Sequence, residues 1–317
     1  MVRTRVLYAD GHVQTEDGIE CARRAPAGAT VWVDLVATTE IGLAVLPPEW
    51  RFHPLALEDC IHDQRRAKYE RFPGHDFLVL QALDQSTDAD LDTQPVRVFY
   101  RPGLVVTVRQ APCAAIDVVA RLCTEDPDRV GGGADRLLHA LLDAIVDEFM
   151  PLLHTWEEAL DGIEDQMEEH PEQPQIERLV QVRRRLLVTL RQMAPLQEIV
   201  RRLMDGPDTI ESSRVYFRDV LDHIEAINDT VHLLKEVCDG IMRLHMERSN
   251  ERLNRVMKYL AIVSTLLLPM TVISGVFGMN FDVIPTQHDR FGFWSAVALM
   301  VASAAGLLGW FRRKGWM

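Results

Sequence analysis

The chain has 317 residues, of which 47% are hydrophobic and 26% are charged, and its mean hydropathy is −0.05. The formal net charge of −13 argues against nucleic acid as a partner and is compatible with cations as ligands, although an ordinary acidic soluble surface is the commoner explanation. A hydropathy near zero indicates that most of the chain is a large aqueous domain.

The first 110 residues alternate short β-rich runs with turn signals, at residues 5–8, 30–35, 77–80, 96–100 and 104–108. The turn Arg101-Pro102-Gly103 predicts a hairpin between the last two runs. A helical pattern intervenes at residues 53–59. We therefore expect an N-terminal α/β domain with a mixed sheet over residues 1–134.

Residues 135–253 have a helical period and are expected to form a long-helix bundle and stalk. Breaks near Pro171 and Pro207 divide them into three helices, and the first is predicted to run from 135 to 170. Its acidic end and the basic second helix favour antiparallel packing over catalysis by these carboxylates. The third helix begins near Ser212 and is expected to continue unbroken into a membrane.

Two apolar stretches close the sequence, at residues 259–277 and 291–311. Their 19 and 21 residues contain no charge, and each is long enough as a helix to cross a hydrocarbon core of roughly 30 Å. We expect a transmembrane hairpin over 254–317, with helix 1 at about 255–278, a loop at 279–290, helix 2 at about 291–311 and a basic tail. The fold class predicted is an α+β membrane protein.

The charges beside the two stretches predict how the chain lies in the membrane. Arg312, Arg313 and Lys314 follow the second span, while Arg255 and Lys258 precede the first. By the positive-inside rule, both termini face the cytosol, as expected of a multi-pass protein of the cell membrane. The start of the sequence has no apolar segment typical of a secretory signal, and the five cysteines show no metal-binding spacing, so reduced thiols in the cytosol are expected.

Small and polar side chains form one helical stripe along the first span. Its members recur at steps of three and four residues: Asn254, Met257, Ala261, Ser264, Leu268, Thr271 and Gly275. Tight helix packing is the ordinary explanation of such a stripe. Because two spans cannot enclose a pore, a water-lined stripe would require several chains around one axis, with Asn280 at the outer mouth.

The stripe carries no charge, and this absence favours Mg²⁺ among divalent cations. Mg²⁺ dehydrates reluctantly, so a pore can handle its hydrated form with amide, hydroxyl and carbonyl oxygens. A dehydrated transition metal is met more naturally by His, Cys or carboxylate, which the stripe lacks.

At this point the sequence resembles the CorA-type divalent metal ion transporters. The turn Gly278-Met279-Asn280 between two terminal spans is similar to that family's signature. The likeness covers about residues 50–317, and its other segments are residues 53–59 with 65–70, 216–223, Asn254 to Lys258, and Pro269 with Thr271.

The resemblance implies a homopentamer whose first span lines the pore, with Mg²⁺ as transported and regulatory ion and with no organic cofactor. Asn254, Met257, Leu268, Thr271 and Gly275 match pore-lining positions of the family, and Ala261 and Ser264 of the same stripe are expected to line the pore with them. Gly278, Met279 and Asn280 match the family's entrance motif. Asp219 matches the acidic residue that binds regulatory Mg²⁺ at the subunit boundary. Its partner carboxylate is expected after the run 77–80, with Asp84 as first choice and Asp88 as second.

The segment after the signature departs from the magnesium type. Residues 282–289 lack the usual acidic turn, and they include His288 and Asp289, which could favour zinc, nickel or cobalt. The function predicted is a pentameric, channel-like influx path for divalent cations, Mg²⁺ first and Co²⁺ or Ni²⁺ also considered, gated by cytosolic metal between subunits. The alternative is a Zn²⁺ transporter similar to the ZntB type.

Two other classes of function compete with transport. Asp219, Asp222 and His223 have the spacing of paired metal ligands, which would suit a membrane-tethered metalloenzyme. No catalytic motif accompanies them in the sequence, so we do not expect an enzyme. A membrane-anchored sensor without transport is the third class, and a flux measurement separates it from a transporter.

Overall fold

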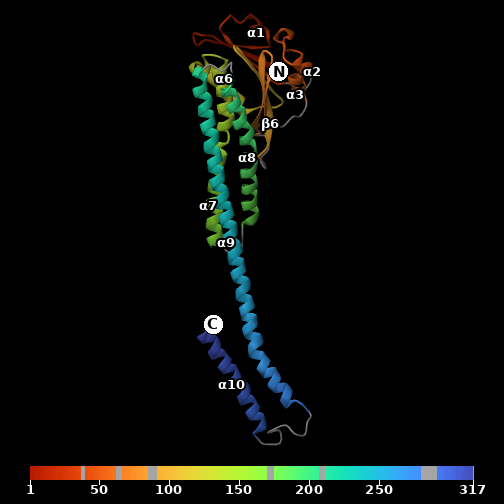
Figure 1. Cartoon of the computed structure of the whole chain (residues 1–317), viewed down its shortest axis with the longest axis vertical. Helices are drawn as coiled ribbons and strands as arrows, with labels where there is room; N and C mark the ends of the chain where they lie inside the picture. The colour runs from red at the N-terminus through yellow and green to blue at the C-terminus, as the bar shows by residue number, and fades with distance from the viewer. Residues whose placement is uncertain are drawn as a thin grey trace. The chain divides into compact units, whose positions relative to one another are not determined.

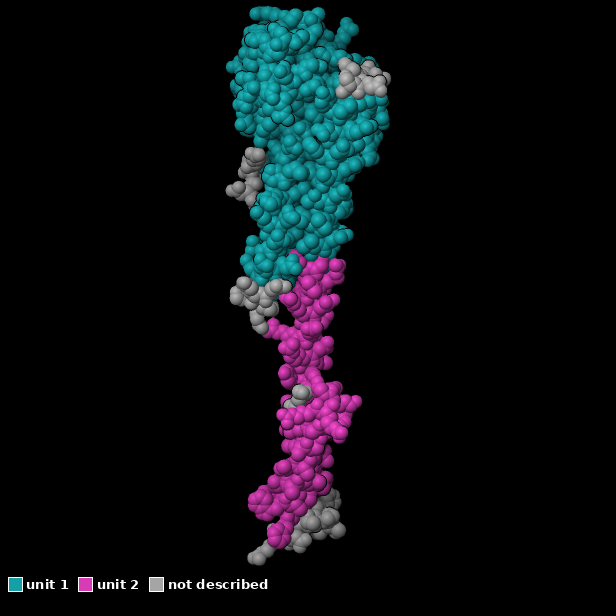
Figure 2. All heavy atoms as spheres, turned by 90° about the vertical axis from the view of Figure 1, so that its left-hand side faces the viewer, with its two compact units in different colours: residues 1–239 teal, residues 240–317 magenta. Residues whose placement is uncertain are grey.

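The computed structural model describes residues 1–36, 40–61, 66–84, 91–169, 175–206, 211–279 and 291–316 (Figure 1). Contacts divide the chain into two compact units, residues 1–239 and residues 240–317 (Figure 2). This division is coarser than the three segments expected from the sequence, which stay a prediction.

The first unit contains a seven-stranded sheet in the order β2-β1-β3-β7-β6-β5-β4. Its strands are β1 (Val2–Leu7), β2 (Val13–Asp17), β3 (Thr30–Val36), β4 (Lys68–Phe72), β5 (His75–Leu83), β6 (Thr93–Arg101) and β7 (Leu104–Arg109). Strands β3 and β7 pair in parallel, and the other neighbours pair antiparallel. The sheet is therefore mixed, as the sequence predicted.

The hairpin predicted at Arg101-Pro102-Gly103 is confirmed. Strands β6 and β7 pair in register from Arg101 opposite Leu104, which leaves a two-residue turn. Gly103 has a φ of +80°, a conformation that costs glycine little because it has no Cβ.

Both faces of the sheet are covered. Because side chains alternate along a strand, Val33 and Val106 lie on one face, in a core with Ala56 of α3 (Pro54–Ile61). The opposite face is covered by α4 (Ala114–Glu125) and α6 (Ala134–Asp147). The remaining short elements are α1 (Glu20–Arg24), α2 (Glu40–Leu43), the 3-10 turn η1 (Pro48–Trp50) and α5 (Pro127–Val130).

The single helix expected over 135–170 is wrong, because the structure has two helices there. Helix α6 ends at Asp147, and α7 (Met150–Glu169) starts after Phe149, which is fully buried. Pro151 explains the break: proline has no N–H to donate and disfavours helical conformation in the residue before it, but it is tolerated in a first turn.

Helix α8 (Ile176–Met204) runs beside the first part of α9 (Glu211–Phe277). The Arg183 side chain donates to Asp239 at 3.0 Å, and Gln197 donates to Glu225 at 3.2 Å. Helix α8 also contacts the acidic α7. Arg183 and Arg201 of α8 thus pair with acidic side chains of α9, a partner that the sequence did not predict.

The second unit holds the C-terminal part of α9 and the helix α10 (Gly292–Arg313). Both helices are long and apolar enough to cross a membrane. Helix α9 is unbroken from the first unit to Phe277 and contains Pro269, which confirms the continuous third helix. The C-terminal end of α9 and both ends of α10 lie within two residues of the ends predicted for the two spans.

Candidate metal cluster and candidate pore-lining stripe

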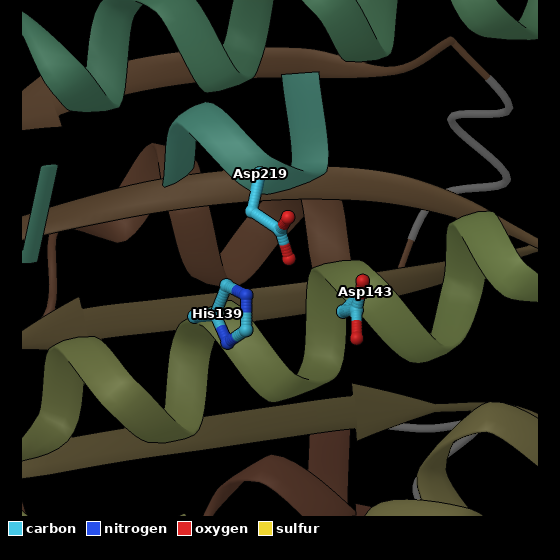
Figure 3. A group of neighbouring side chains, drawn as sticks. All are labelled: His139, Asp143 and Asp219. Carbon is cyan, nitrogen blue, oxygen red and sulfur yellow. The ribbon is translucent and has the colours of Figure 1, made fainter. Parts of the chain in front are cut away.

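Two helices of the first unit, α6 and α9, bring histidines and aspartates together. Figure 3 shows three of these side chains, His139, Asp143 and Asp219. Helix α6 is amphipathic, and Leu138, Leu142 and Val146 of its apolar face are fully buried. Its other side carries His139, Asp143 and Asp147 at four-residue steps, so these three side chains share one face.

Asp219 and His223 of α9, also four residues apart, meet that face. One group consists of His139, Asp143 and Asp219, and the other of Asp143, Asp147 and His223; within each group the candidate ligand atoms lie within 4.8 Å of one another. Nδ1 of His223 lies 3.1 Å from Asp143 and 3.8 Å from Asp147. Asp143 belongs to both groups, so we call the five residues the α6–α9 cluster.

The cluster is half-buried and carries three carboxylates. The Asp143 side chain is 24% exposed and the Asp147 side chain 58%. Burial, with the charges of Asp143 and Asp219, raises the pKa of the Asp147 carboxyl above its ordinary value, although His223 opposes the shift. Burial lowers the pKa of the His139 imidazole, despite nearby Asp143 and Asp219. The site therefore disfavours further negative charge and holds an imidazole that is neutral at pH 7.

This donor set fits a divalent cation. A neutral imidazole and ionised carboxylates are the protonation states that a metal requires. Nε2 of His139 is buried and has no hydrogen-bond partner among the described residues, which leaves it available as a ligand. Carboxylate oxygens suit Mg²⁺, which keeps several waters, while the two imidazoles suit Zn²⁺, Co²⁺ or Ni²⁺ as well.

The predicted regulatory residues lie in different places. Asp219 belongs to the cluster, but Asp222, its neighbour in the alternative ligand set, belongs to neither described group. Asp84 follows β5 and lines a cleft of about 530 Å³ together with Asp147 and Glu148. Asp88 lies outside the described residues. The first-choice partner Asp84 is thus near the cluster's edge without being one of its members.

The sequence reasoning missed His139, Asp143 and Asp147. Their four-residue spacing was visible, yet a polar face on an amphipathic helix is usually solvated. Only the packing of α9 against α6 distinguishes this face from any other.

In the second unit, all seven residues of the predicted pore stripe are exposed within the single chain. Met257 and Leu268 are each 67% exposed. The more covered positions of the same segment form a separate stripe that includes Lys258, Ile262 and Leu266. Ile262 is 3% exposed, and the Lys258 amine donates to the Gly315 carbonyl at 3.4 Å. The chain's own C-terminal segment therefore lies on another side of α9 and leaves the small and polar stripe free.

The entrance motif is partly described. The Gly278 N–H donates to the Ser274 carbonyl at 2.9 Å, and a Cβ at position 278 would lie 3.1 Å from that oxygen. Such a contact is tight, so glycine suits this helix end. Met279 is 51% exposed. Asn280 lies outside the described residues, as do His288 and Asp289.

Comparisons with known proteins point to one family. The family model described as "CorA-like Mg2+ transporter protein" matches residues 27–313. The chain is 30% identical over 293 residues to YfjQ of Bacillus subtilis, an alignment that covers 92% of this chain and 91% of YfjQ. It is 30% identical over 269 residues to the cobalt/magnesium transport protein CorA of Thermotoga maritima, covering 84% of this chain and 77% of the relative.

Solved structures agree in fold. The complete CorA magnesium transporter of Methanocaldococcus jannaschii superimposes with a TM-score of 0.84 at 21% identity, over 100% of this chain and 99% of that chain. The cytoplasmic domain of ZntB from Vibrio parahaemolyticus gives 0.64 at 16% identity, over 78% and 98%. The chain belongs to the CorA-like Mg²⁺ transporter family, and it is a divalent metal cation transporter of the CorA type rather than an enzyme.

Proposed function

We propose that the chain assembles as a homopentamer in the cell membrane and conducts Mg²⁺ into the cytosol, where both of its termini lie. The observation that carries this proposal is the exposed stripe of α9, from Asn254 to Gly275, which the chain's own C-terminal segment leaves uncovered. A helix face with amide and hydroxyl groups is poorly suited to lipid. Five such faces around an axis would instead contact water.

The chemistry of the stripe supports a hydrated ion as cargo. Thr271 and Ser264 offer hydroxyl oxygens, and Asn254 offers an amide at the cytosolic end. Met257 and Leu268 would form apolar constrictions. Because Mg²⁺ keeps its waters, outer-sphere contacts of this kind can select it without a charged residue in the pore. Gly278, Met279 and Asn280 would form the entrance.

The α6–α9 cluster supports gating by the transported ion. Three carboxylates within one cluster repel one another, and a bound divalent cation offsets that repulsion. Asp219 is exposed and can also face a neighbouring subunit, where Asp84 or Asp88 of that subunit would complete the site. Bound Mg²⁺ would then shift the population toward a closed assembly when cytosolic Mg²⁺ is plentiful.

A ZntB-like Zn²⁺ transporter is the second candidate, and one observation favours it. His139 and His223 both lie in the cluster, and imidazole nitrogen binds Zn²⁺, Co²⁺ and Ni²⁺ better than it binds Mg²⁺. Uptake into proteoliposomes distinguishes the candidates when Mg²⁺, Co²⁺, Ni²⁺ and Zn²⁺ are compared with and without a pH gradient. Mg²⁺ uptake without proton coupling is expected.

The Asn280→Ala variant tests the entrance in the same assay. We expect loss of uptake with unchanged assembly on size-exclusion chromatography. Uptake of Zn²⁺ in preference to Mg²⁺ would favour the second candidate, and the absence of flux for every ion would favour a sensor without transport.

A further inference from the structure

A second cleft of the first unit shares no lining residue with the α6–α9 cluster and has the opposite electrostatic character. It has a volume of about 680 Å³, within the range of small-molecule sites, and lies beside β1, β3, β7 and α4. Four arginines line it against three carboxylates, in a chain whose net charge is −13: Arg3, Arg5, Arg109, Arg121, Asp34, Asp117 and Glu125.

Most of the negative charge in this cleft is already paired. Nη2 of Arg109 lies 2.9 Å from Asp34, and Thr107 also donates to that carboxylate at 2.9 Å. Nη2 of Arg109 lies 3.4 Å from Asp117 as well. Asp34 and Arg109 are both nearly buried, so this pair neutralises itself within the wall of the cleft.

Arg5 is different, because it is buried and unpaired. The residue is 6% exposed, and its guanidinium carbon lies 4.7 Å from the centre of the Trp32 ring. Nη1 of Arg5 has no hydrogen-bond partner, and no carboxylate in the described part of the chain forms an ion pair with it. A buried charge without a partner is costly, so this guanidinium is suited to an anion that enters from the cleft.

We propose that this cleft binds a small molecule that carries a phosphate group, with the phosphate on Arg5. The planar guanidinium matches phosphate oxygens through two parallel hydrogen bonds. Arg121, exposed on α4, adds a second positive charge that suits a dianion, and Val36 and Val118 provide apolar wall for the rest of the molecule. The cleft is too large for one phosphate ion alone, so an organic phosphate monoester is the expected ligand.

Calorimetric titration of the full-length protein in nanodiscs tests the proposal, with divalent cations removed so that metal phosphates do not form. The probes are phenyl phosphate, inorganic phosphate and benzoate. Phenyl phosphate should bind more tightly than inorganic phosphate, which identifies an ester as the source; equal affinity identifies the free ion. Benzoate binding as tightly as phenyl phosphate would overturn the assignment to phosphate.

Arg5→Met keeps an apolar stem over Trp32 and removes the charge. We expect at least a tenfold loss of phenyl phosphate affinity. The melting temperature of the free protein should change little, because the loss of the cation–π contact with Trp32 is offset by the removal of a buried charge that has no ion pair. Arg23→Met is the matched control, since Arg23 pairs with Glu20 outside the cleft. It should bind as the parent does.

Arg121→Ala provides a second variant whose folding is not at risk, because Arg121 is exposed. A few-fold loss of affinity is expected. No binding of phenyl phosphate by the parent protein, or equal binding by the Arg5→Met variant, would refute the site.

Discussion

The two units differ in what covers their apolar side chains. In the first unit, Trp32, Phe77 and Phe99 are at most 1% exposed, because helices cover both faces of the sheet. In the second unit, only 6% and 11% of the apolar windows of α9 and α10 are buried. The first unit has a core made by its own chain, whereas the second must be covered by lipid or by other copies.

A polar side chain on a helix surface therefore indicates something different in each unit. In the first unit an apolar side chain marks the core and a polar stripe marks solvent, unless another helix packs on it, as α9 packs on the polar face of α6. In the second unit apolar side chains are suited to lipid, and the small and polar stripe is the exceptional surface. In the first unit, candidate functional residues are therefore the polar side chains that another helix covers. In the second unit they are the small and polar side chains among apolar ones.

The largest expected effect comes from chemical modification of two neighbouring positions on different faces of α9, both of which are exposed in the single chain. Leu268 and Leu267 are 67% and 54% exposed. We expect a water-soluble cationic methanethiosulfonate to react with the Leu268→Cys variant and to abolish Mg²⁺ uptake almost completely. Leu267→Cys should retain uptake, because a thiol facing lipid forms little reactive thiolate.

The native cysteines provide a low background for that experiment. All five are buried and unpaired in disulfides, and burial raises the pKa of Cys60 to about 12 and that of Cys113 to about 11. Equal inhibition of the two variants would show that the stripe is not a distinct face of the pore.

The next effect tests whether the first unit is self-sufficient. Phe77 is fully buried, with its ring centre 4.9 Å from that of Phe99. Phe77→Ala should lower the free energy of unfolding by about 3–5 kcal/mol. Phe293→Ala, at a position that is 72% exposed in α10, should change it by less than about 0.5 kcal/mol.

Urea unfolding followed by near-ultraviolet circular dichroism in detergent measures both variants. Comparable destabilisation by the two substitutions would mean that the units do not unfold independently. The difference in burial between the two units would then not correspond to a difference in stability.

The sequence predicted the interior of the fold better than its edges. The runs that became β3, β5, β6 and β7 are rich in β-branched and aromatic residues, and these strands lie inside the sheet. Strands β2 and β4 were missed. They form the two edges of the sheet, and the charged runs Val13–Asp17 and Lys68–Phe72 carry little apolar pattern because edge strands are commonly charged.

The candidate sites could also be predicted only in part from the sequence. The two spans could be predicted from charge-free length alone, since a bilayer imposes that length. Asp219 came from the family resemblance, whereas His139, Asp143 and Asp147 depend on which helix packs beside α6. That choice is made by tertiary packing, for which the periodicity of a single helix contains no information.

A smaller effect is expected from the cluster. Asp219→Asn should raise, by about tenfold, the Mg²⁺ concentration that protects the purified protein from protease, because about 1.4 kcal/mol of charge-assisted binding corresponds to that factor. Asp222→Asn is the matched control: the same charge is removed one turn away, at a residue outside both described groups. Unchanged protection in Asp219→Asn would remove this residue from regulation.

The smallest effect is a pH dependence, which we expect to arise in the first unit because the buried residues described in the second include no titratable group. His75 is 5% exposed, and its ring packs near those of Phe52, Phe72 and Phe99. Burial lowers its pKa, and the nearby His53 and Arg101 act in the same direction while Asp76 opposes them.

The folded state therefore keeps His75 neutral at a pH where the unfolded chain takes up a proton. Stability should fall as the pH drops below about 6.5, and the loss should level off once the pH passes the lower folded-state pKa.

The His75→Phe variant fits the aromatic surroundings and has no imidazole to protonate. Between pH 7 and pH 5 its free energy of unfolding should therefore fall by less than that of the parent protein, with a difference of about 1 kcal/mol or less. His139 is also held neutral by burial, so part of the slope should persist in that variant. Urea midpoints measured across this pH range check the result, and an unchanged slope in His75→Phe would assign the whole dependence to His139 and the cluster.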